Sequence, residues 1–366
     1  MSSLHHLHNH HHHHHAHHEN HHHHRHGEKH CQSTILTPIS DHACFVTIEL
    51  KDELKSSSNG KAMKIYFKLV EACLQIMERW NKEKCTQFAV GFGYELTNSI
   101  LGNIQDNSLD YVREYMQAEI FPQYPKDLKG KFGGFPNTGG DLFLHIKSVN
   151  MDNCFRATQD FANHEFISPL IKKIQDETYA FLHRRNKKSG LGRDLSGFED
   201  GTENPKEMEE KIEATLTNEK DSFLLAQKWV HNLKFFNSLS LKEQENDIGR
   251  TKEDSIELEN KPETSHVARV TLEKDGDEIE VVRQSMSFGN SSQHGLFFIS
   301  YANSGKTFIH QLESMVGKGE YATPQGHNDH IMRFSTNILG SLYFIPSIGT
   351  LLKMREKLTS YRPSRL

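Results

Sequence analysis

Apolar and polar positions follow two different rhythms along the first half of the chain. Short alternating or continuous apolar runs are typical of strands, whereas apolar residues about three to four positions apart are typical of amphipathic helices. The longest helical pattern spans 61–84, where apolar side chains recur at this spacing from Met63 to Trp80. We therefore expect strands at 45–50, 87–93 and 141–146, and helices at 61–84, 108–121 and 156–183.

The same order of elements returns in the second half. A polar, glycine-rich stretch at 184–211 separates the two passes and is typical of a loop or linker. Behind it we expect strands at 223–231, 266–272, 278–282 and 296–301, helices at 233–245 and 307–315, and a last segment near 342–346. Two passes of strand–helix–strand–strand–helix–strand predict an α+β fold with two ferredoxin-like (βαββαβ) halves, each an antiparallel sheet covered by helices on one face.

Composition divides the chain into four segments. Residues 1–30 hold 17 of the 27 histidines and very few apolar residues, a composition that cannot bury a core. This tract can bind metal ions loosely, although a repeat expansion or a tag explains it equally well. We expect a disordered His-rich tail at 1–36, an N-terminal ferredoxin-like half at 37–190, a loop and linker at 191–215, and a C-terminal half at 216–366.

Charge and cysteine usage exclude several classes of protein. The formal net charge of −5 falls entirely outside 1–30, whose charges cancel, so clustered Lys and Arg for non-specific nucleic-acid binding are not expected. No apolar run reaches the roughly 18 residues of a membrane span, and no apolar leader opens the chain, so we expect a cytoplasmic protein. The five scattered cysteines contain no CxxC pair, which argues against a zinc ribbon or covalently attached haem and favours reduced thiols.

Three segments carry candidate chemistry. The loop from Gly197 to Pro205 reads Gly-Phe-Glu-Asp-Gly-Thr-Glu-Asn-Pro and presents Asp200 between glycines. An Asp-Gly pair is usually only a turn, but its extension to Thr-x-Asn-Pro is much rarer. His266 opens an expected strand, where a lone histidine is more often structural. Arg283 directly follows two valines, so its guanidinium can enter a pocket or simply extend along the surface.

Taken together, these segments resemble the dye-decolourising peroxidases, and most closely their compact intracellular members. The loop 197–201 matches the GxxDG signature of that family and continues as its common DGTxNP. Further matching blocks follow in order over 190–350: Trp229-Val230-His231 with Gln244-Glu245, Ile248-Gly249-Arg250-Thr251-Lys252, Ser265-His266-Val267-Ala268, and Arg283-x-Ser-Met.

The resemblance implies a non-covalent haem b, one per chain, held mainly by the C-terminal half. It makes His266 the ligand of the haem iron and Asp329 the carboxylate that receives the other ring N–H. Asp200 is implied as the acid–base residue and Arg283 as the group that stabilises negative charge on the cleaved O–O bond. Ser285 stands where many members have Asn. The remaining haem contacts implied are Arg250, Lys252 and Phe298.

The implied function is reduction of hydrogen peroxide and one-electron oxidation of dye-like or phenolic donors through a ferryl intermediate. Two alternatives remain open. One is a haem carrier or sensor with incidental peroxidase activity, which needs no pair like Asp200 and Arg283. The other is an interaction protein on a ferredoxin-like scaffold, whose His-rich tail binds metal. Neither nucleic acid nor a membrane is an expected partner, and the resemblance implies a homo-oligomer, with a dimer as our expectation.

Overall fold

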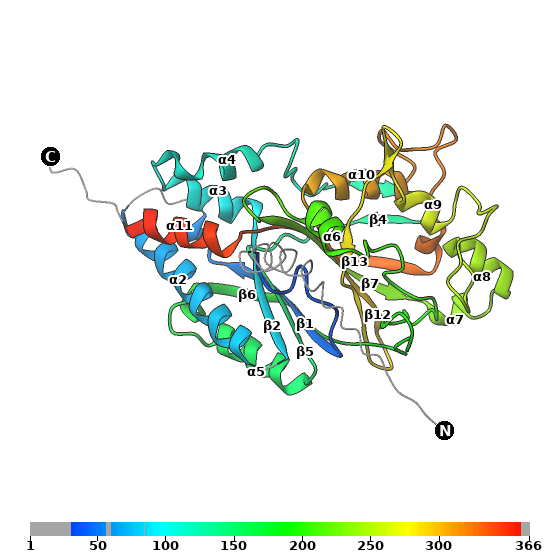
Figure 1. Ribbon diagram of the computed structural model, residues 1–366, viewed down its shortest axis with the longest axis horizontal. Coiled ribbons are helices and arrows are strands. Elements are labelled where there is room, and N and C mark those ends of the chain that lie inside the picture. The colour runs from blue at the N-terminus through cyan, green and yellow to red at the C-terminus, as the bar shows by residue number, and fades with distance from the viewer. Residues whose placement is uncertain (1–30, 56–59, 84, 360–366) are drawn as a thin grey trace, which may run out of the picture.

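The computed structural model of the chain describes residues 31–55, 60–83 and 85–359. Helices of varied length surround one large sheet in this part of the chain (Figure 1). The expected disorder of 1–30 lies outside the described residues. Residues 31–36, which the composition assigns to the same tail, instead form an ordered segment in which Gln32, Thr34 and Ile35 are almost fully buried.

The N-terminal half has the expected ferredoxin-like topology. Its strands pair antiparallel in the order β6-β1-β5-β2, which places the first strand in the interior of this half. The helices pack on one face of the strands (Figure 1). The elements are β1 (His42–Leu50), α2 (Gly60–Lys82), β2 (Thr86–Gly93), β5 (Leu142–Ser148), α5 (Met151–Ala162) and β6 (Ile171–Phe181).

The C-terminal half repeats that topology with different connections. Its strands pair in the order β13-β7-β12-β11, and the short β10 (Val282–Arg283) lies beside β12 on the same edge as β11. The principal elements are β7 (Ser222–His231), β11 (Met286–Gly289), β12 (His294–Ala302), α10 (Gly305–Met315) and β13 (Ser335–Ile345). The two expected halves are thus confirmed, and their strands belong to a single nine-stranded sheet within the described residues.

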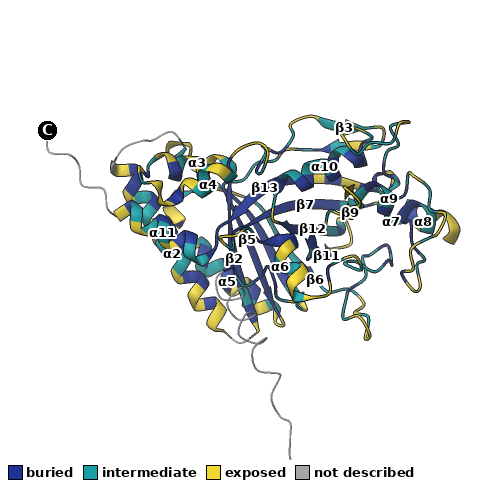
Figure 2. Cartoon of the chain, turned by 45° about the horizontal axis from the view of Figure 1, so that its top comes forward, coloured by how far each residue is buried: buried dark blue, intermediate teal, exposed yellow. Residues whose placement is uncertain are grey.

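Two seams join the halves into a closed ring of strands. β13 pairs with β2 through Tyr343 and Phe344, and β11 pairs with β6 through Ser287 and Phe288. Because β12 also pairs with β7, both ends of the series meet. Aromatic side chains stack inside the ring, with Phe45 and Phe297 ring centroids 4.4 Å apart. Figure 2 shows these strands as the most buried part of the molecule, with exposed residues on the outward helix faces.

The remaining elements connect or cover this ring. None of the helices in the described part of the chain is long and apolar enough to cross a membrane. The connecting elements are α3 (Tyr94–Gly102), α4 (Asp110–Tyr115), α6 (Met208–Thr215), α7 (Leu233–Phe236), α8 (Leu241–Ile248), α9 (His266–Val270), α11 (Ile348–Thr359), β3 (Leu128–Gly130), β4 (Gly133–Phe135), β8 (Glu273–Lys274), β9 (Asp277–Glu278) and the 3-10 turns Asp52–Leu54, Asn107–Leu109, Ser168–Leu170 and His330–Arg333.

Several predicted elements are wrong. The expected helix at 156–183 ends at Ala162, and Pro169 lies in the 3-10 turn before β6, because proline lacks the N–H that a helix interior requires. The expected strand at 266–272 is the short helix α9, whose N-terminus is capped by the Ser265 hydroxyl. The expected helix at 233–245 is split into α7 and α8, because a capping box between Ser240 and Glu243 starts a new helix.

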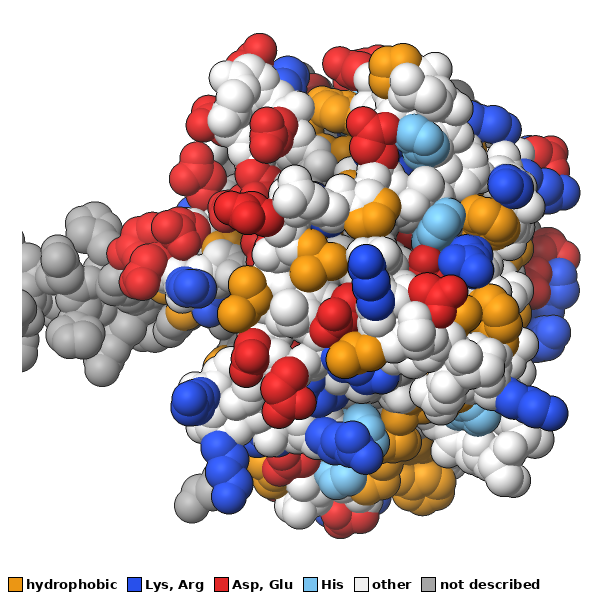
Figure 3. Space-filling model, turned by 90° about the vertical axis from the view of Figure 1, so that its right-hand side faces the viewer, with side chains coloured by type: hydrophobic (Ala, Val, Ile, Leu, Met, Phe, Trp, Pro, Cys, Tyr) orange, Lys and Arg blue, Asp and Glu red, His pale blue; other side chains and the backbone are white. Residues whose placement is uncertain are grey.

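Three further differences concern the extent of elements. The helix expected at 108–121 is limited to α4 and its preceding turn, and the strand expected at 278–282 is reduced to the ends of β9 and β10. The C-terminal helix α11 was not anticipated. On the face drawn in Figure 3, acidic side chains are most frequent at the upper left, and basic side chains lie mainly toward the right and the bottom.

Candidate active site

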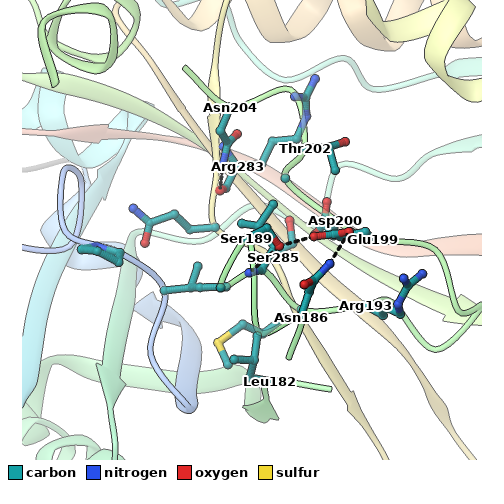
Figure 4. A pocket seen from close by; sticks show the side chains of 18 of the residues that line it. Leu182, Asn186, Ser189, Arg193, Glu199, Asp200, Thr202, Asn204, Arg283 and Ser285 are labelled. Atoms are coloured by element: carbon teal, nitrogen blue, oxygen red, sulfur yellow. Dashed lines mark hydrogen bonds between the residues drawn. The ribbon is translucent and has the colours of Figure 1, made fainter. Parts of the chain in front are cut away.

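Two adjoining cavities open where the C-terminal half meets the loop 191–205. The outer cavity has a volume of about 740 Å³ and extends to residues 35–39 (Figure 4). The inner cavity has a volume of about 160 Å³ and lies against β7, α9 and α10. Asp200 and Arg283 line both cavities, so they lie at the junction between them. Two of the sequence-predicted residues are therefore brought together at one place.

A tight hairpin positions Asp200. The Asp200 backbone N–H donates to Gly192 O at 3.0 Å, and the Asp194 N–H donates to Phe198 O at 2.8 Å. Gly197 and Gly201 have φ values of +93° and +82°, a region that favours glycine, which explains both glycines of the GxxDG pattern. The hairpin thus fixes the acid by backbone geometry.

An arginine fastens this hairpin to the neighbouring loop. The Arg193 guanidinium donates to Gly197 O at 2.8 Å and to Lys252 O at 2.7 Å, and a third bond reaches Glu253 O at 2.7 Å. A planar guanidinium can bridge several acceptors at once, so Arg193 ties two loops together.

A single asparagine positions Arg283. The Asn204 side chain donates to Arg283 O and accepts from Arg283 N–H, each at 2.8 Å, so it pairs with that residue as a neighbouring strand would. Figure 4 shows Asn204 directly beside Arg283. The sequence reasoning assigned no role to Asn204. The signal that could have found it was the uncommon Thr-x-Asn-Pro extension.

The environment of Asp200 raises the pKa of its carboxyl to about 6. Burial is the largest cause, because it disfavours the charged form. The Arg283 guanidinium opposes this by favouring the ionised carboxyl, while the nearby Asp194 carboxylate adds to the increase. Burial also lowers the pKa of Arg283. A carboxyl with a pKa near neutrality can both accept and return a proton.

A histidine–carboxylate pair stands on α9. The His266 Nδ1 lies 2.7 Å from Asp329 Oδ2, and Asp329 is completely buried. The second Asp329 oxygen accepts from Ile331 N–H at 2.9 Å, which orients the carboxylate. Because Nδ1 is engaged, Nε2 is the ring nitrogen available to a ligand, and His266 lines the inner cavity.

The other walls of the inner cavity are mainly apolar. Phe298, which the resemblance implies as a haem contact, is among the residues that line this cavity. The apolar lining residues are Phe198, Leu225, Trp229, Ile248, Val267, Val270, Leu296, Phe298, Leu312, Met315, Ile331 and Phe334. A largely apolar slot with the imidazole of His266 on its wall suits a flat, largely hydrophobic cofactor with a metal at its centre.

The three remaining predicted residues are placed differently from one another. Arg250 lines the inner cavity and is bound to Ser255 O, Glu203 and Glu257. Ser285 lines only the outer cavity.

Lys252 lines neither cavity. Its ammonium donates to Gln244 Oε1 at 2.6 Å and lies over the rings of Phe198 and Phe236. The structure therefore does not bring Lys252 to the site.

A second histidine–carboxylate pair borders the inner cavity and was missed in the sequence. His231 Nε2 lies 3.0 Å from Asp194 Oδ1, and His231 Nδ1 lies 2.7 Å from the Ser335 hydroxyl. Although burial raises the pKa of Asp194, His231 and the hydrogen bonds from Ser196 hold it below its ordinary value. Asp194 is therefore a fixed negative charge near Asp200.

Comparison with known proteins gives a consistent result. A family model described as "Dyp-type peroxidase, C-terminal" matches residues 192–350. A dye-decolorizing peroxidase of Mycobacterium tuberculosis is 36% identical over 242 residues, covering 62% of this chain and 66% of that protein. One from Mycolicibacterium paratuberculosis is 34% identical over 242 residues, covering 62% of this chain and 63% of that protein. The matched stretches thus span slightly less than two thirds of these curated relatives.

Solved structures match over a larger part of the chain. A dye-decolorizing protein from V. cholerae superposes with a TM-score of 0.69 at 29% identity, covering 89% of this chain and 99% of that one. A variant of DypB from Rhodococcus jostii in complex with heme gives a TM-score of 0.68 at 28% identity, covering 90% of this chain and 97% of that one. The similarity therefore includes both ferredoxin-like halves.

Proposed function

The chain belongs to the dye-decolorizing peroxidase family, and from this premise we propose that it is a haem peroxidase that reduces hydrogen peroxide and oxidises organic donors. The observation that carries the proposal is the arrangement around one cavity. His266, backed by Asp329, and Asp200, beside Arg283, all belong to its surroundings. The first pair offers a ligand for a haem iron, and the second offers an acid–base group and a positive charge for peroxide.

The donor set fits a non-covalent haem b. His266 would hold the haem iron through Nε2, and the Asp329 carboxylate would make the imidazole a stronger electron donor. The apolar walls, Phe298 included, suit the macrocycle, and Arg250, which also lines this cavity, is the cation we assign to a propionate. A bound haem supplies the iron at which peroxide is cleaved and through which donors lose single electrons.

Asp200 moves the proton in this account. Above about pH 6 its carboxylate is mainly ionised and can take a proton from hydrogen peroxide. The same oxygen then returns the proton to the departing oxygen atom, which leaves as water. Arg283 stabilises the negative charge that develops during cleavage, and Asn204 holds the backbone of Arg283 in place.

The outer cavity supports the proposed donor class. A volume of about 740 Å³ is in the range of pockets that take drug-sized molecules, so a phenol or a small aromatic dye fits the space in front of Asp200. A haem carrier or sensor is less well supported, because it has no use for an acid of raised pKa beside an arginine.

The test is a comparison of three haem-loaded proteins with a phenol and an anthraquinone dye. We expect the wild-type protein to oxidise both donors only when peroxide is present. Asp200→Asn should retain haem and lose activity, because the amide cannot accept the proton. Asp127→Asn, the same substitution at an exposed ion pair with Lys129, is the matched control and should retain activity. Equal activity in Asp200→Asn and the control would contradict the proposal.

A further inference from the structure

The ordered segment at 32–37 joins parts of the molecule that are far apart in sequence. The Gln32 side chain donates to Val90 O at 2.9 Å and to Pro346 O at 2.8 Å, and it accepts from Val90 N–H at 2.7 Å. Val90 belongs to β2, and Pro346 follows β13, so Gln32 bridges one of the seams between the halves. We call residues 32–37 the strap.

A buried lysine and a buried glutamine hold the strap. Lys147 on β5 donates from Nζ to Thr34 O at 3.0 Å, to Thr37 O at 2.7 Å and to Gln284 Oε1 at 2.6 Å. Gln284 donates from Nε2 to Thr34 O at 2.7 Å and to Ile35 O at 2.8 Å. The strap, Lys147 and Gln284 therefore form one closed hydrogen-bonded cluster.

The burial of Lys147 gives this cluster its significance. Its side chain is 1% exposed and forms no ion pair within the described residues, and burial lowers its pKa. A buried amino group is costly unless its hydrogen bonds are satisfied, and three acceptors match the three protons of an ammonium group. An apolar side chain would fill the ring interior at a lower cost in free energy. We therefore attribute the presence of a lysine at this position to its hydrogen bonds with the strap.

Gln284 connects the strap to the candidate active site. It stands between Arg283 and Ser285, and its backbone N–H donates to Ile299 O at 3.0 Å. Asn204 fixes the backbone of Arg283, so the segment 283–285 is held by Asn204, by β12 and by the strap. Residues 35–37 also line the outer cavity together with this segment.

We propose that the strap positions Arg283 and Ser285, and that Lys147 and Gln284 are the positioning residues that clamp it. This inference rests on the proposed peroxidase function. Neither clamp residue touches peroxide or haem. They act by keeping the segment 283–285 against the strap, so that the Arg283 guanidinium stays at the junction of the two cavities.

The experiment compares Lys147→Met with Lys228→Met in the haem-loaded protein. Lys228 is a matched control because it is also a buried lysine of the ring, but its ammonium donates to Asp176 rather than to the strap. Gln284→Met is the second variant. It removes the side-chain amide that donates to the strap, and it keeps the two strap carbonyls that accept from Lys147. Three quantities are measured: hydrogen exchange of strap amides, the rate constant for peroxide, and cyanide affinity of the ferric haem.

We expect faster exchange of the strap amides in Lys147→Met and Gln284→Met. The peroxide rate constant should fall by about 10- to 100-fold, because a misplacement of about 1 Å has effects of that order. Cyanide, a small ligand of ferric haem, should also bind more weakly, because the Arg283 guanidinium would no longer be held at the junction of the two cavities. Haem affinity should stay unchanged, and Lys228→Met should retain wild-type strap exchange and peroxide rate.

Two outcomes would overturn the inference. One is unchanged strap exchange in both clamp variants, which would show that Lys147 and Gln284 do not hold the strap. The other is a loosened strap with wild-type peroxide rate and cyanide affinity. If the wild-type protein itself does not react with peroxide, the proposed function fails, whereas the cyanide measurement still decides the role of the strap.

Discussion

The two halves share a topology, but the outward face of the first strand has a different use in each half. On β1 the outward residues Cys44, Val46, Ile48 and Leu50 are buried in the core formed with α2 and α5. On β7 the corresponding outward face carries Leu225, Gln227, Trp229 and His231, and these residues line the inner cavity. The shared fold therefore does not determine where a site forms. The position of the site depends on the segment that covers the first strand of each half.

The difference arises from the segment between the first and second strands of each half. In the N-terminal half this segment contains α2, a 23-residue helix whose Tyr66, Leu69 and Ile76 are fully buried against the sheet. In the C-terminal half it contains α7, α8 and α9, helices of four, eight and five residues. Short helices cannot cover the strand with one continuous apolar stripe, so space remains for His266 and a cofactor.

The largest expected effect comes from removing the proposed ligand of the haem iron. His266→Ala deletes the only imidazole nitrogen that α9 presents to the inner cavity. We expect haem to be lost on gel filtration and the Soret band of any retained haem to shift. Asp329→Asn keeps the imidazole, so its haem affinity should fall by about 10- to 100-fold. Normal ferric spectra in His266→Ala would remove this residue as the ligand.

The next largest effect concerns the proton. Asp200→Asn should lower the rate constant for peroxide by about 100- to 10,000-fold, the usual contribution of a positioned acid–base group. Rapid mixing of the haem-loaded variant with peroxide measures this rate. Haem affinity should not change, because Asp200 lies at the junction of the two cavities and the carboxylate that holds His266 is Asp329. A decrease of less than tenfold would count against Asp200 as the acid–base residue.

The comparison between β1 and β7 becomes sharper with a pair of core truncations. Ile48→Ala on β1 should lower the free energy of unfolding by about 2–5 kcal/mol without changing haem affinity. Leu225→Ala on β7 should cost the haem-free protein less, because its side chain already borders a cavity, but should weaken haem binding. Denaturant unfolding and haem titration measure both quantities. Equal changes in the free energy of unfolding and in haem affinity in both variants would mean that the outward faces of β1 and β7 have the same use.

The smallest expected effect is a shift in pH dependence. Asp194→Asn removes the negative charge that raises the pKa of Asp200, so the decline of the peroxide rate at low pH should move to a lower pH. Asp221→Asn is the control, since burial also raises the pKa of Asp221 to about 6 although it lines neither cavity. An unchanged decline in Asp194→Asn would show that Asp194 does not influence Asp200.

The sequence predicted the strands of the two halves better than the helices and turns that cover them. The strands β1, β2, β5, β7 and β12 were found because their apolar runs are long and continuous. Local signals were overlooked where they compete with periodicity, as with Pro169 and the Ser265 cap.

The roles predicted for Asp200, Arg283 and His266 came from the family resemblance, because an Asp-Gly turn, a lone histidine and an arginine after two valines do not by themselves indicate chemistry. Residues that act by holding others, such as Asp194 and Lys147, depend on contacts between distant segments. No local pattern reports such contacts. Lys252 shows the converse, because its position in a matching block did not place it at the cavity.

The central claim is that Asp200 is the group that accepts the proton of hydrogen peroxide. The most direct measurement is the rate constant for peroxide between pH 4 and 9, roughly the range over which carboxyl and histidine groups titrate, in haem-loaded wild-type protein and Asp200→Asn. The pKa of Asp200 is raised to about 6, so the ionised fraction falls below this pH. We predict a wild-type rate that is constant above about pH 6 and declines about tenfold per unit well below it, with no such decline in Asp200→Asn. The same decline in both proteins would contradict the account.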